Sequence, residues 1–316
     1  MYINDQETFD RWLSTFNPVF YVGIDTEFIR KSTFFPKLVL FQISSKQDTV
    51  VIDVLQVNIR ALIEKIQDNS LIKIFFSGLQ DLEAIFCAYD VLLAPVFDIQ
   101  IACDFLPHRD NIGFQEIVEE VCHIQLKKEY QKINWEKRPL SKEEIAYAYE
   151  DAFYLIPVFQ TLKKKLKKIE RYSWVLEESS HMLDQVMDQG NLYFEKKIFH
   201  PLSRHMTLQK ELVLWRESYA RLKNVLRKQV YSDAFIHEVK ELFWDPIIEK
   251  DYDYPISHKQ MSEFRKISKK IFRLGKEHNI SKKYFDYPIE MMKLCFEPTE
   301  SNLFLTGWRN QVLKLI

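Results

Sequence analysis

Three short apolar segments within the first 55 residues of this 316-residue chain constrain its fold more than any other feature. The segments "VFYVGIDTEF", "KLVLFQISS" and "DTVVIDV" are rich in β-branched residues and are separated by short polar stretches, so each predicts a β-strand. Connections this short favour antiparallel neighbours. The chain is therefore expected to begin as an antiparallel sheet.

Helical and strand patterns alternate in the next part of the chain. The segment "NIRALIEKIQD" predicts a helix, "LIKIFFSG" a buried strand, and "LQDLEAIFCAYD" a helix with Asp81 in its first turn. A helix that crosses over between strands implies parallel pairing from there on. The segment 139–168 predicts one long helix, with Ser141 and Glu144 as its capping box. Beyond residue 170 the pattern is helical throughout, so we expect an α/β domain followed by an all-α region.

Composition and charge exclude several classes of protein. None of the six glycines lies in a G-x-G-x-x-G or P-loop pattern, so no nucleotide cofactor is expected. The N-terminal segment carries acids where a signal peptide carries lysines, and no apolar run approaches the ~20 residues that span a bilayer, so we expect a cytoplasmic protein without a membrane anchor. From Ser257 onward twelve basic residues face six acids, which favours a polyanionic partner, although lysine-rich helix faces are also often simply solvated.

Two acids, Asp25 and Glu27, end the first predicted strand. Residues two apart on a strand share a face, so both carboxylates point the same way and Thr26 points the other way. Carboxylates held this close repel each other unless a cation lies between them. The alternative is a solvated strand end, with the acids paired to Arg30 or Lys31.

Two further acids belong to predicted helices. Tyr147 and Asp151 are four residues apart and share a helical face that is otherwise apolar. An acid there is either metal-bound or hydrogen-bonded within the core, for example to its own tyrosine neighbour. Asp81 follows a buried strand, where ligands gather in α/β sheets, but an acid in a first helical turn also complements the helix dipole without any ligand.

These four acids together favour a metal site. Carboxylate oxygens without histidine or cysteine partners select Mg²⁺ or Mn²⁺. Two such ions about 4 Å apart assist displacement at phosphorus. The substrate of such a site would be a phosphodiester.

Three segments resemble the exonuclease motifs of ribonuclease D, a member of the tyrosine branch of the DEDD 3′-5′ exonucleases. They are "DTEFIRKSTFFPKLVLFQIS" (25–44), "IFFSGLQDLEAIF" (74–86) and "NWEKRPLSKEEIAYAYEDAFYLIPVF" (134–159), and "FDIQIACDFL" (97–106) resembles the stretch between the second and third motifs. The resemblance implies an RNase H-like α/β fold that binds two divalent metal ions. It also implies that Asp25, Glu27, Asp81 and Asp151 are the ligands and that Tyr147 contacts the attacking water.

The C-terminal part resembles the HRDC domain, a small helical nucleic-acid-binding module. "LVLWRESYARLKNVLRKQVYSD" (212–233) looks like the start of a first HRDC domain, and "LTGWRNQVLKLI" (305–316) looks like the end of a second. The expected organisation is an exonuclease domain (1–170), a helical linker (171–205), a truncated first HRDC-like domain (206–256) and a second HRDC-like region (257–316).

Substrate-binding residues are expected in both regions: Thr26, Phe28, Trp215 and Arg216. For the segment "LWRE" the alternative is an amphipathic helix with Leu214 and Trp215 in a core. The chain departs from the family at residues 76–78, where Phe-Ser-Gly replaces a His-Ala-Gly-like turn, and we expect altered packing there.

The resemblance implies a metal-dependent 3′-5′ exoribonuclease that releases nucleoside 5′-monophosphates, with tRNA precursors as the family's substrate. Two alternatives remain open. One is a catalytically inactive RNA-binding protein that keeps the fold, and the other is a DNA-directed 3′-5′ exonuclease. Oligonucleotides of equal sequence separate RNA from DNA as substrates, because only contacts to the 2′-OH distinguish the two.

Overall fold

The chain forms two compact units, which are described separately. The computed structural model describes residues 1–107, 112–127, 130, 133–188, 206–236, 258–281, 284–285 and 302–313. The first unit comprises Met1–Lys31 with Phe35–Val186, and the second comprises Ser32–Phe34 with Met187–Ile316. Within the described ranges, no helix combines the length and the apolar character that crossing a bilayer requires.

The first unit is built on a mixed sheet of six strands in the order β1-β4-β3-β2-β5-β6. The strands β2, β3 and β4 pair antiparallel, as predicted, whereas β5 pairs parallel with both β2 and β6, and β1 pairs parallel with β4. The strands are β1 (Tyr2–Ile3), β2 (Tyr21–Ile29), β3 (Lys37–Ser44), β4 (Thr49–Asp53), β5 (Ile72–Phe75) and β6 (Val96–Asp98).

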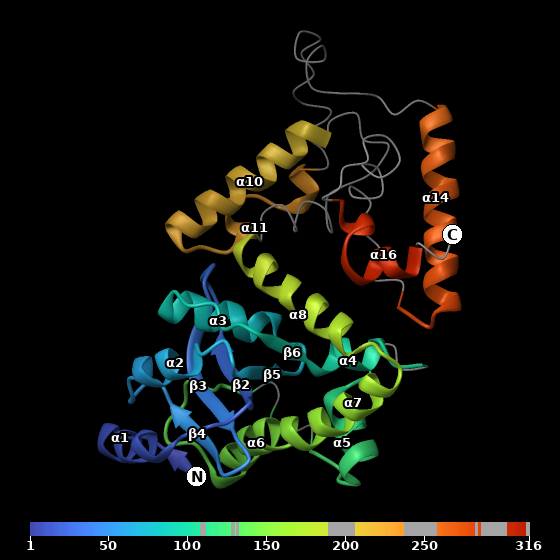
Figure 1. Cartoon of the computed structure of the whole chain (residues 1–316). Coiled ribbons are helices and arrows are strands. Elements are labelled where there is room, and N and C mark those ends of the chain that lie inside the picture. Colours follow the sequence, from blue (N-terminus) through green and yellow to red (C-terminus); the bar gives the residue numbers. More distant parts are fainter. Residues whose placement is uncertain are drawn as a thin grey trace. The chain divides into compact units, whose positions relative to one another are not determined.

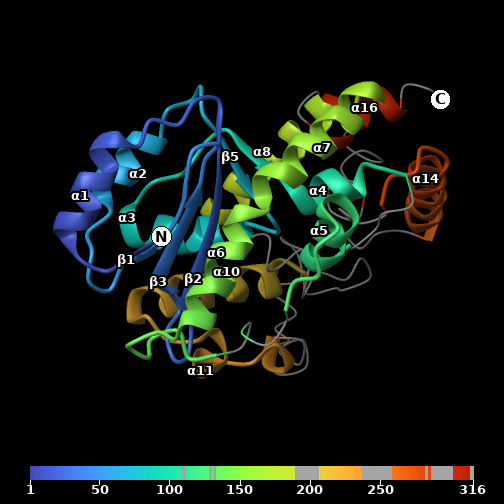
Figure 2. The same cartoon turned by 90° about the horizontal axis from the view of Figure 1, so that it is seen from below.

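Helices cover both faces of this sheet. Figure 2 shows α1, α2 and α3 on one side of the strands and α6 on the other. The first face buries a large apolar core that includes Val22 and Ile24 of β2, and the opposite face buries a smaller core that includes Val39 of β3 and Ala148 of α6. The helices of this unit are α1 (Gln6–Thr15), α2 (Arg60–Ile66), α3 (Leu79–Tyr89), α4 (Ile99–Asp104), α5 (Phe114–Cys122), α6 (Lys142–Phe153), α7 (Leu155–Lys168) and α8 (Tyr172–Met187).

Helix α1 corrects the expectation that the first 55 residues form strands only. Asp5 caps this helix, since its carboxylate accepts a hydrogen bond from the Thr8 N–H at 2.8 Å. Phe9 and Trp12, one helical turn apart, are both buried. The helical spacing of Phe9 and Trp12, together with the capping acid Asp5, is the feature of the sequence that indicates this helix.

The single long helix predicted over residues 139–168 is two helices, α6 and α7, separated at Tyr154. Pro157 explains the break, because in a continuous helix its ring would clash with the carbonyl of Phe153 four residues earlier. The predicted capping box is confirmed: Ser141 Oγ accepts from the Glu144 N–H at 3.1 Å, and Glu144 Oε2 accepts from the Ser141 N–H at 2.6 Å.

The first unit ends at Val186, whereas we predicted a boundary at residue 170 followed by a linker. Helix α8 accounts for the difference. Its Met182 and Val186 are buried in the larger core, and Ser179 Oγ accepts a hydrogen bond from the Asp98 N–H at 3.0 Å. The apolar face of α8 therefore belongs to the α/β unit.

The described residues of the second unit contain helices and no strand (Figure 1). Trp308 is fully buried, and its ring meets that of Phe285 at a centroid distance of 5.5 Å. The division into 206–256 and 257–316 remains a prediction, because residues 237–257 lie outside the described ranges. The helical elements are α10 (Met206–Lys223), α11 (Arg227–Val230), α14 (His258–Glu277), the 3₁₀ helix η3 (Leu303–Leu305) and α16 (Gly307–Leu313).

Candidate active site

Strand β2 carries Asp25 and Glu27 on the face of the sheet covered by α6 and α7. Gly23 precedes them on this face, and a Cβ at Gly23 would lie 2.9 Å from Leu155 Cβ and 3.2 Å from the Ala152 carbonyl oxygen. Only a glycine leaves room for the helices at this distance. The close approach brings the end of α6, which holds Asp151, to the middle of β2. The acids do not end the strand as predicted, because β2 continues to Ile29 and pairs with β3 beyond an irregularity between Glu27 and Phe28.

Three of the four predicted acids meet at this point. Asp25, Glu27 and Asp151 each offer a carboxylate oxygen, and these three atoms lie within 4.8 Å of one another. The prediction that Asp25 and Glu27 share a face is confirmed by this geometry. Oxygen ligands at such spacing fit a hard divalent cation.

The fourth acid, Asp81, adjoins the cluster from the first turn of α3. Its Oδ1 accepts hydrogen bonds from the Thr26 N–H at 3.1 Å and from Thr26 Oγ1 at 2.5 Å. The charge of Asp81 nevertheless raises the pKa of both Asp25 and Glu27, so it lies close to both. The Thr26 hydroxyl therefore donates to Asp81, and the expected contact of Thr26 with substrate stays a prediction.

Burial raises the pKa of all four acids. Loss of solvent is the largest cause for each, and it brings Asp81 to about 6 and Asp151 to about 7. The pKa of Asp25 and of Glu27 lies well above its ordinary value, because repulsion from neighbouring carboxylates adds to the cost of burial. Asp81 is buried and the other three carboxylates are partly buried, and no cationic side chain is among these causes, so together they form a donor set suited to divalent metal ions.

Tyr147 lies one turn before Asp151 on α6. Burial, followed by the charges of Asp151 and Glu27, raises the pKa of the Tyr147 hydroxyl far above its ordinary value. The hydroxyl is therefore a hydrogen-bond donor at neutral pH. Its interaction with Asp151 in turn lowers the pKa of that carboxyl, against the larger effect of burial.

Asp98 is a functional neighbour that our reading of the sequence missed. It is the last residue of β6 and the N-cap of α4, is 1% exposed, and accepts hydrogen bonds from the Gly78 N–H at 2.8 Å and the Ile101 N–H at 2.9 Å. Gly78 begins α3, which carries Asp81, and Ser77 before it has a left-handed φ of 54°. Asp98 therefore fixes the turn that replaces the family's His-Ala-Gly. The available signal was an acid placed between a short strand and a helix, as an N-cap.

The remaining predicted substrate-binding residues lie in different settings. Phe28 packs against the larger core. In the second unit, Arg216 is 1% exposed and binds Asp233 at 2.8 Å, whereas Trp215 is 54% exposed. Trp215 stacks on Tyr231, with the ring centroids 5.9 Å apart and the planes 5° apart. Trp215 therefore does not lie in a core, and Arg216 is interior.

Residues 1–167, more than half of the chain, match the family model described as 3′-5′ exonuclease. The chain belongs to this family. Within the family it resembles ribonuclease D of Bartonella henselae, with 32% identity over 232 residues, which are 72% of this chain and 57% of the relative. Ribonuclease D of Pseudomonas paraeruginosa is 31% identical over 227 residues, 70% of this chain and 60% of the relative. These similarities confirm the resemblance to ribonuclease D, and this chain spans about three fifths of the length of the relatives it matches.

Solved structures show the same fold. The crystal structure of Escherichia coli RNase D superposes with a TM-score of 0.79 and 19% sequence identity, covering 100% of this chain and 96% of that chain. Brucella melitensis NrnC bound to pGG gives a TM-score of 0.52 at 25% identity, covering 63% of this chain and 96% of that chain. The predicted α/β exonuclease fold followed by a helical region is confirmed.

Proposed function

We propose that this protein is a metal-dependent 3′-5′ exoribonuclease. The observation that carries the proposal is the convergence of Asp25, Glu27 and Asp151 within 4.8 Å, with Asp81 beside them, in a chain of this family. Several relatives named ribonuclease D support RNA as the substrate. Single-stranded 3′ ends of structured RNAs such as tRNA precursors are the proposed substrates.

Divalent ions would be held by Asp25, Glu27, Asp81 and Asp151. Mg²⁺ and Mn²⁺ fit these carboxylates, and a pair of ions would supply positive charge against the attacking and leaving oxygens of a phosphodiester. Their charge would also offset the repulsion that raises the pKa of Asp25.

The remaining steps belong to side chains of this chain. The protonated Tyr147 hydroxyl orients the attacking water through a hydrogen bond, while Thr26 fixes Asp81 through two hydrogen bonds. The water oxygen forms a bond to the terminal phosphorus, and the bond from phosphorus to the 3′ oxygen of the preceding nucleotide breaks. The products are a nucleoside 5′-monophosphate and an RNA that is one nucleotide shorter and ends in a 3′-OH.

A time course on 5′-labelled RNA with a single-stranded 3′ end tests this proposal. We expect a ladder that shortens one nucleotide at a time in Mn²⁺ or Mg²⁺, is absent in EDTA, and is lost in Asp151→Asn. A DNA strand of equal sequence, run in parallel, should be degraded more slowly. Preferential cleavage of the DNA would assign the DNA-directed alternative. Intact RNA with every metal tried would assign the inactive RNA-binding alternative.

A further inference from the structure

The ring of Tyr147 lies against aromatic rings that do not belong to its own helix. The Trp135 and Tyr147 ring centroids are 6.0 Å apart with planes 30° from each other, and the Tyr130 ring is also 6.0 Å away, at 54°. Trp135 is 4% exposed and forms part of the smaller core with Ala148 of α6. The orientation of the Tyr147 ring therefore depends on the chain segment that precedes α6.

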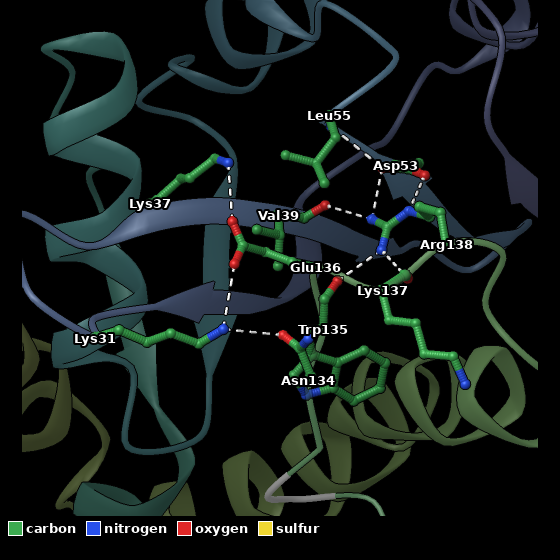
Figure 3. A network of polar contacts seen from close by, with 10 residues as sticks. All are labelled: Lys31, Lys37, Val39, Asp53, Leu55, Asn134, Trp135, Glu136, Lys137 and Arg138. Carbon is green, nitrogen blue, oxygen red and sulfur yellow. Dashed lines mark hydrogen bonds and ion pairs between the residues drawn. The ribbon is translucent and has the colours of Figure 1, made fainter.

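We call this segment, residues 133–140, the strap. Arg138 lies in the strap and binds it to the sheet (Figure 3). Arg138 Nη1 donates to the Trp135 carbonyl at 2.6 Å, while Nε and Nη2 donate to the two carboxylate oxygens of Asp53 at 2.5 and 2.7 Å. Asp53 is fully buried at the end of β4. The bidentate pair fixes both distance and angle, so the strap backbone at Trp135 is held against the sheet.

A second set of contacts joins the strap to the β2–β3 hairpin. Glu136 accepts from Lys31 at 3.3 Å and from Lys37 at 3.1 Å, and Lys31 also donates to Asn134 Oδ1 at 3.2 Å (Figure 3). Both lysine side chains are mostly exposed, so these contacts contribute little to stability. The Arg138–Asp53 pair, in which the carboxylate is fully buried, is the main attachment.

We propose that Trp135 is a positioning residue for Tyr147, holding the tyrosine ring so that its hydroxyl meets the attacking water. The helix backbone fixes the Cβ of Tyr147, but the ring torsion of a tyrosine has a broad minimum and is set by packing. A displacement of about 1 Å at a catalytic group can lower a rate about a hundredfold. This inference rests on the proposed exonuclease activity.

The decisive experiment is a double-mutant cycle between Trp135 and Tyr147 on 5′-labelled RNA, under single-turnover conditions with enzyme in excess. We expect Trp135→Leu to lower the maximal rate about ten- to a hundredfold, with the half-saturating enzyme concentration changed less than about twofold. In the Tyr147→Phe background, where no hydroxyl remains to be positioned, the same substitution should change the rate less than about twofold.

A conservative variant and a matched control complete the design. Trp135→Phe keeps an aromatic face against Tyr147 and should restore most of the rate. Trp12→Leu removes another buried tryptophan, from the larger core on the opposite face of the sheet, and should lower stability without lowering the maximal rate. If Trp135→Leu does not fold, Trp135→Met takes its place in the cycle, because an unbranched side chain refills the space without an aromatic face.

Each result decides between positioning and simple packing. Equal loss in both backgrounds, or an unchanged rate in Trp135→Leu, would overturn the role of Trp135. A wild-type protein that leaves RNA intact would instead overturn the proposed function. If wild type degrades RNA but the effects of the Trp135 and Tyr147 substitutions are additive, only the positioning role of Trp135 is overturned.

Discussion

Individual hydrogen bonds position side chains of this site, and the residue types alone do not predict which bonds form. Thr26 was expected to contact substrate, but both its N–H and its hydroxyl bind Asp81 Oδ1. Two hydrogen bonds to one oxygen of a carboxylate fix the position of that oxygen. Its position then determines the direction in which the other oxygen points. Thr26 therefore acts on the reaction through Asp81.

Thr26→Val removes one of these hydrogen bonds while keeping a β-branched side chain. A hydrogen bond to a charged group contributes about 1.5–3 kcal/mol, so we expect the exonuclease rate to fall about tenfold or more. Thr15→Val is the control, because the Thr15 hydroxyl also donates one hydrogen bond, to the Trp12 carbonyl at 2.9 Å, at the end of α1. Equal rates for wild type and Thr26→Val at saturating metal would contradict a positioning role.

Asp98 makes a pH-dependent contribution to stability. Burial is the largest cause that raises its pKa to about 6, and the charge of Asp104 adds to the increase. A raised pKa means that the folded state holds a proton that the unfolded state has released. The contribution is therefore fully present below the ordinary pKa near 3.8 and is lost as the pH rises through about 6.

We expect wild type to be more stable than Asp98→Asn, with a difference in the free energy of unfolding that narrows as the pH rises from about 3.8 to about 6. Urea unfolding at each pH measures the difference in the free energy of unfolding between the two proteins. Asp5→Asn is the control: Asp5 also caps a helix, but hydrogen bonds from Thr8 lower its pKa, so its contribution is lost only as the pH falls below about 3.8 and should stay constant at higher pH. An advantage of wild type over Asp98→Asn that widens with pH would show that Asp98 is not held in this buried setting.

At the scale of elements, the approach of α6 to β2 assembles the site, and Gly23 permits it. A Cβ at Gly23 would lie 2.5 Å from Ser44 Oγ, the atom that donates to the Ala152 carbonyl at 2.7 Å. We expect Gly23→Ala to lower the free energy of unfolding by about 1–3 kcal/mol, because the helix must shift, and to lower the exonuclease rate with it.

The control for Gly23→Ala is Gly113→Ala. Gly113 precedes α5, and a Cβ there would meet its nearest atom at 3.8 Å, an ordinary contact. Urea unfolding should show a change of less than about 0.5 kcal/mol for this surface position. Similar losses in the two variants would contradict the view that Gly23 is needed for close approach.

The sequence predicted those features of the fold and the site that depend on residues close together along the chain. The shared face of Asp25 and Glu27, the Ser141 capping box and the antiparallel pairing of β2, β3 and β4 all follow from local spacing or short connections. The partners of Thr26, Trp135 and Asp98 did not follow, because each lies 12 to 81 residues away along the chain. Such contacts depend on how elements pack, and one sequence carries no direct record of that.

At the scale of the whole molecule, the second unit offers an exposed aromatic surface. Trp215 and Tyr219 stack with ring centroids 5.2 Å apart, and both side chains are exposed. Exposed aromatic faces are typical sites for stacking of unpaired bases. Trp215 is therefore retained as a proposed contact for RNA, whereas Arg216, which is buried, is not expected to reach it directly.

Trp215→Ala should raise KM for RNA about five- to fiftyfold, the equivalent of about 1–2.3 kcal/mol of lost stacking, with kcat unchanged. Leu222→Ala removes an even more exposed apolar side chain from the same helix and serves as the matched control, with no expected change in KM. A decrease in kcat for Trp215→Ala, with KM unchanged, would contradict a role confined to binding.

Metal binding should couple the acid cluster to the stability of the whole first unit. A ligand that binds only the folded state stabilises it by about 2.7 kcal/mol at a hundredfold excess over its Kd. We therefore expect Mn²⁺ to raise the urea midpoint of wild type and to have little effect on Asp25→Asn, which removes one carboxylate from the cluster. Asp10→Asn changes an exposed acid on α1 and should respond to Mn²⁺ as wild type does. If Mn²⁺ shifts wild type and Asp25→Asn equally, the ion binds elsewhere, and the three converging carboxylates are held together in the folded protein without serving as its metal site.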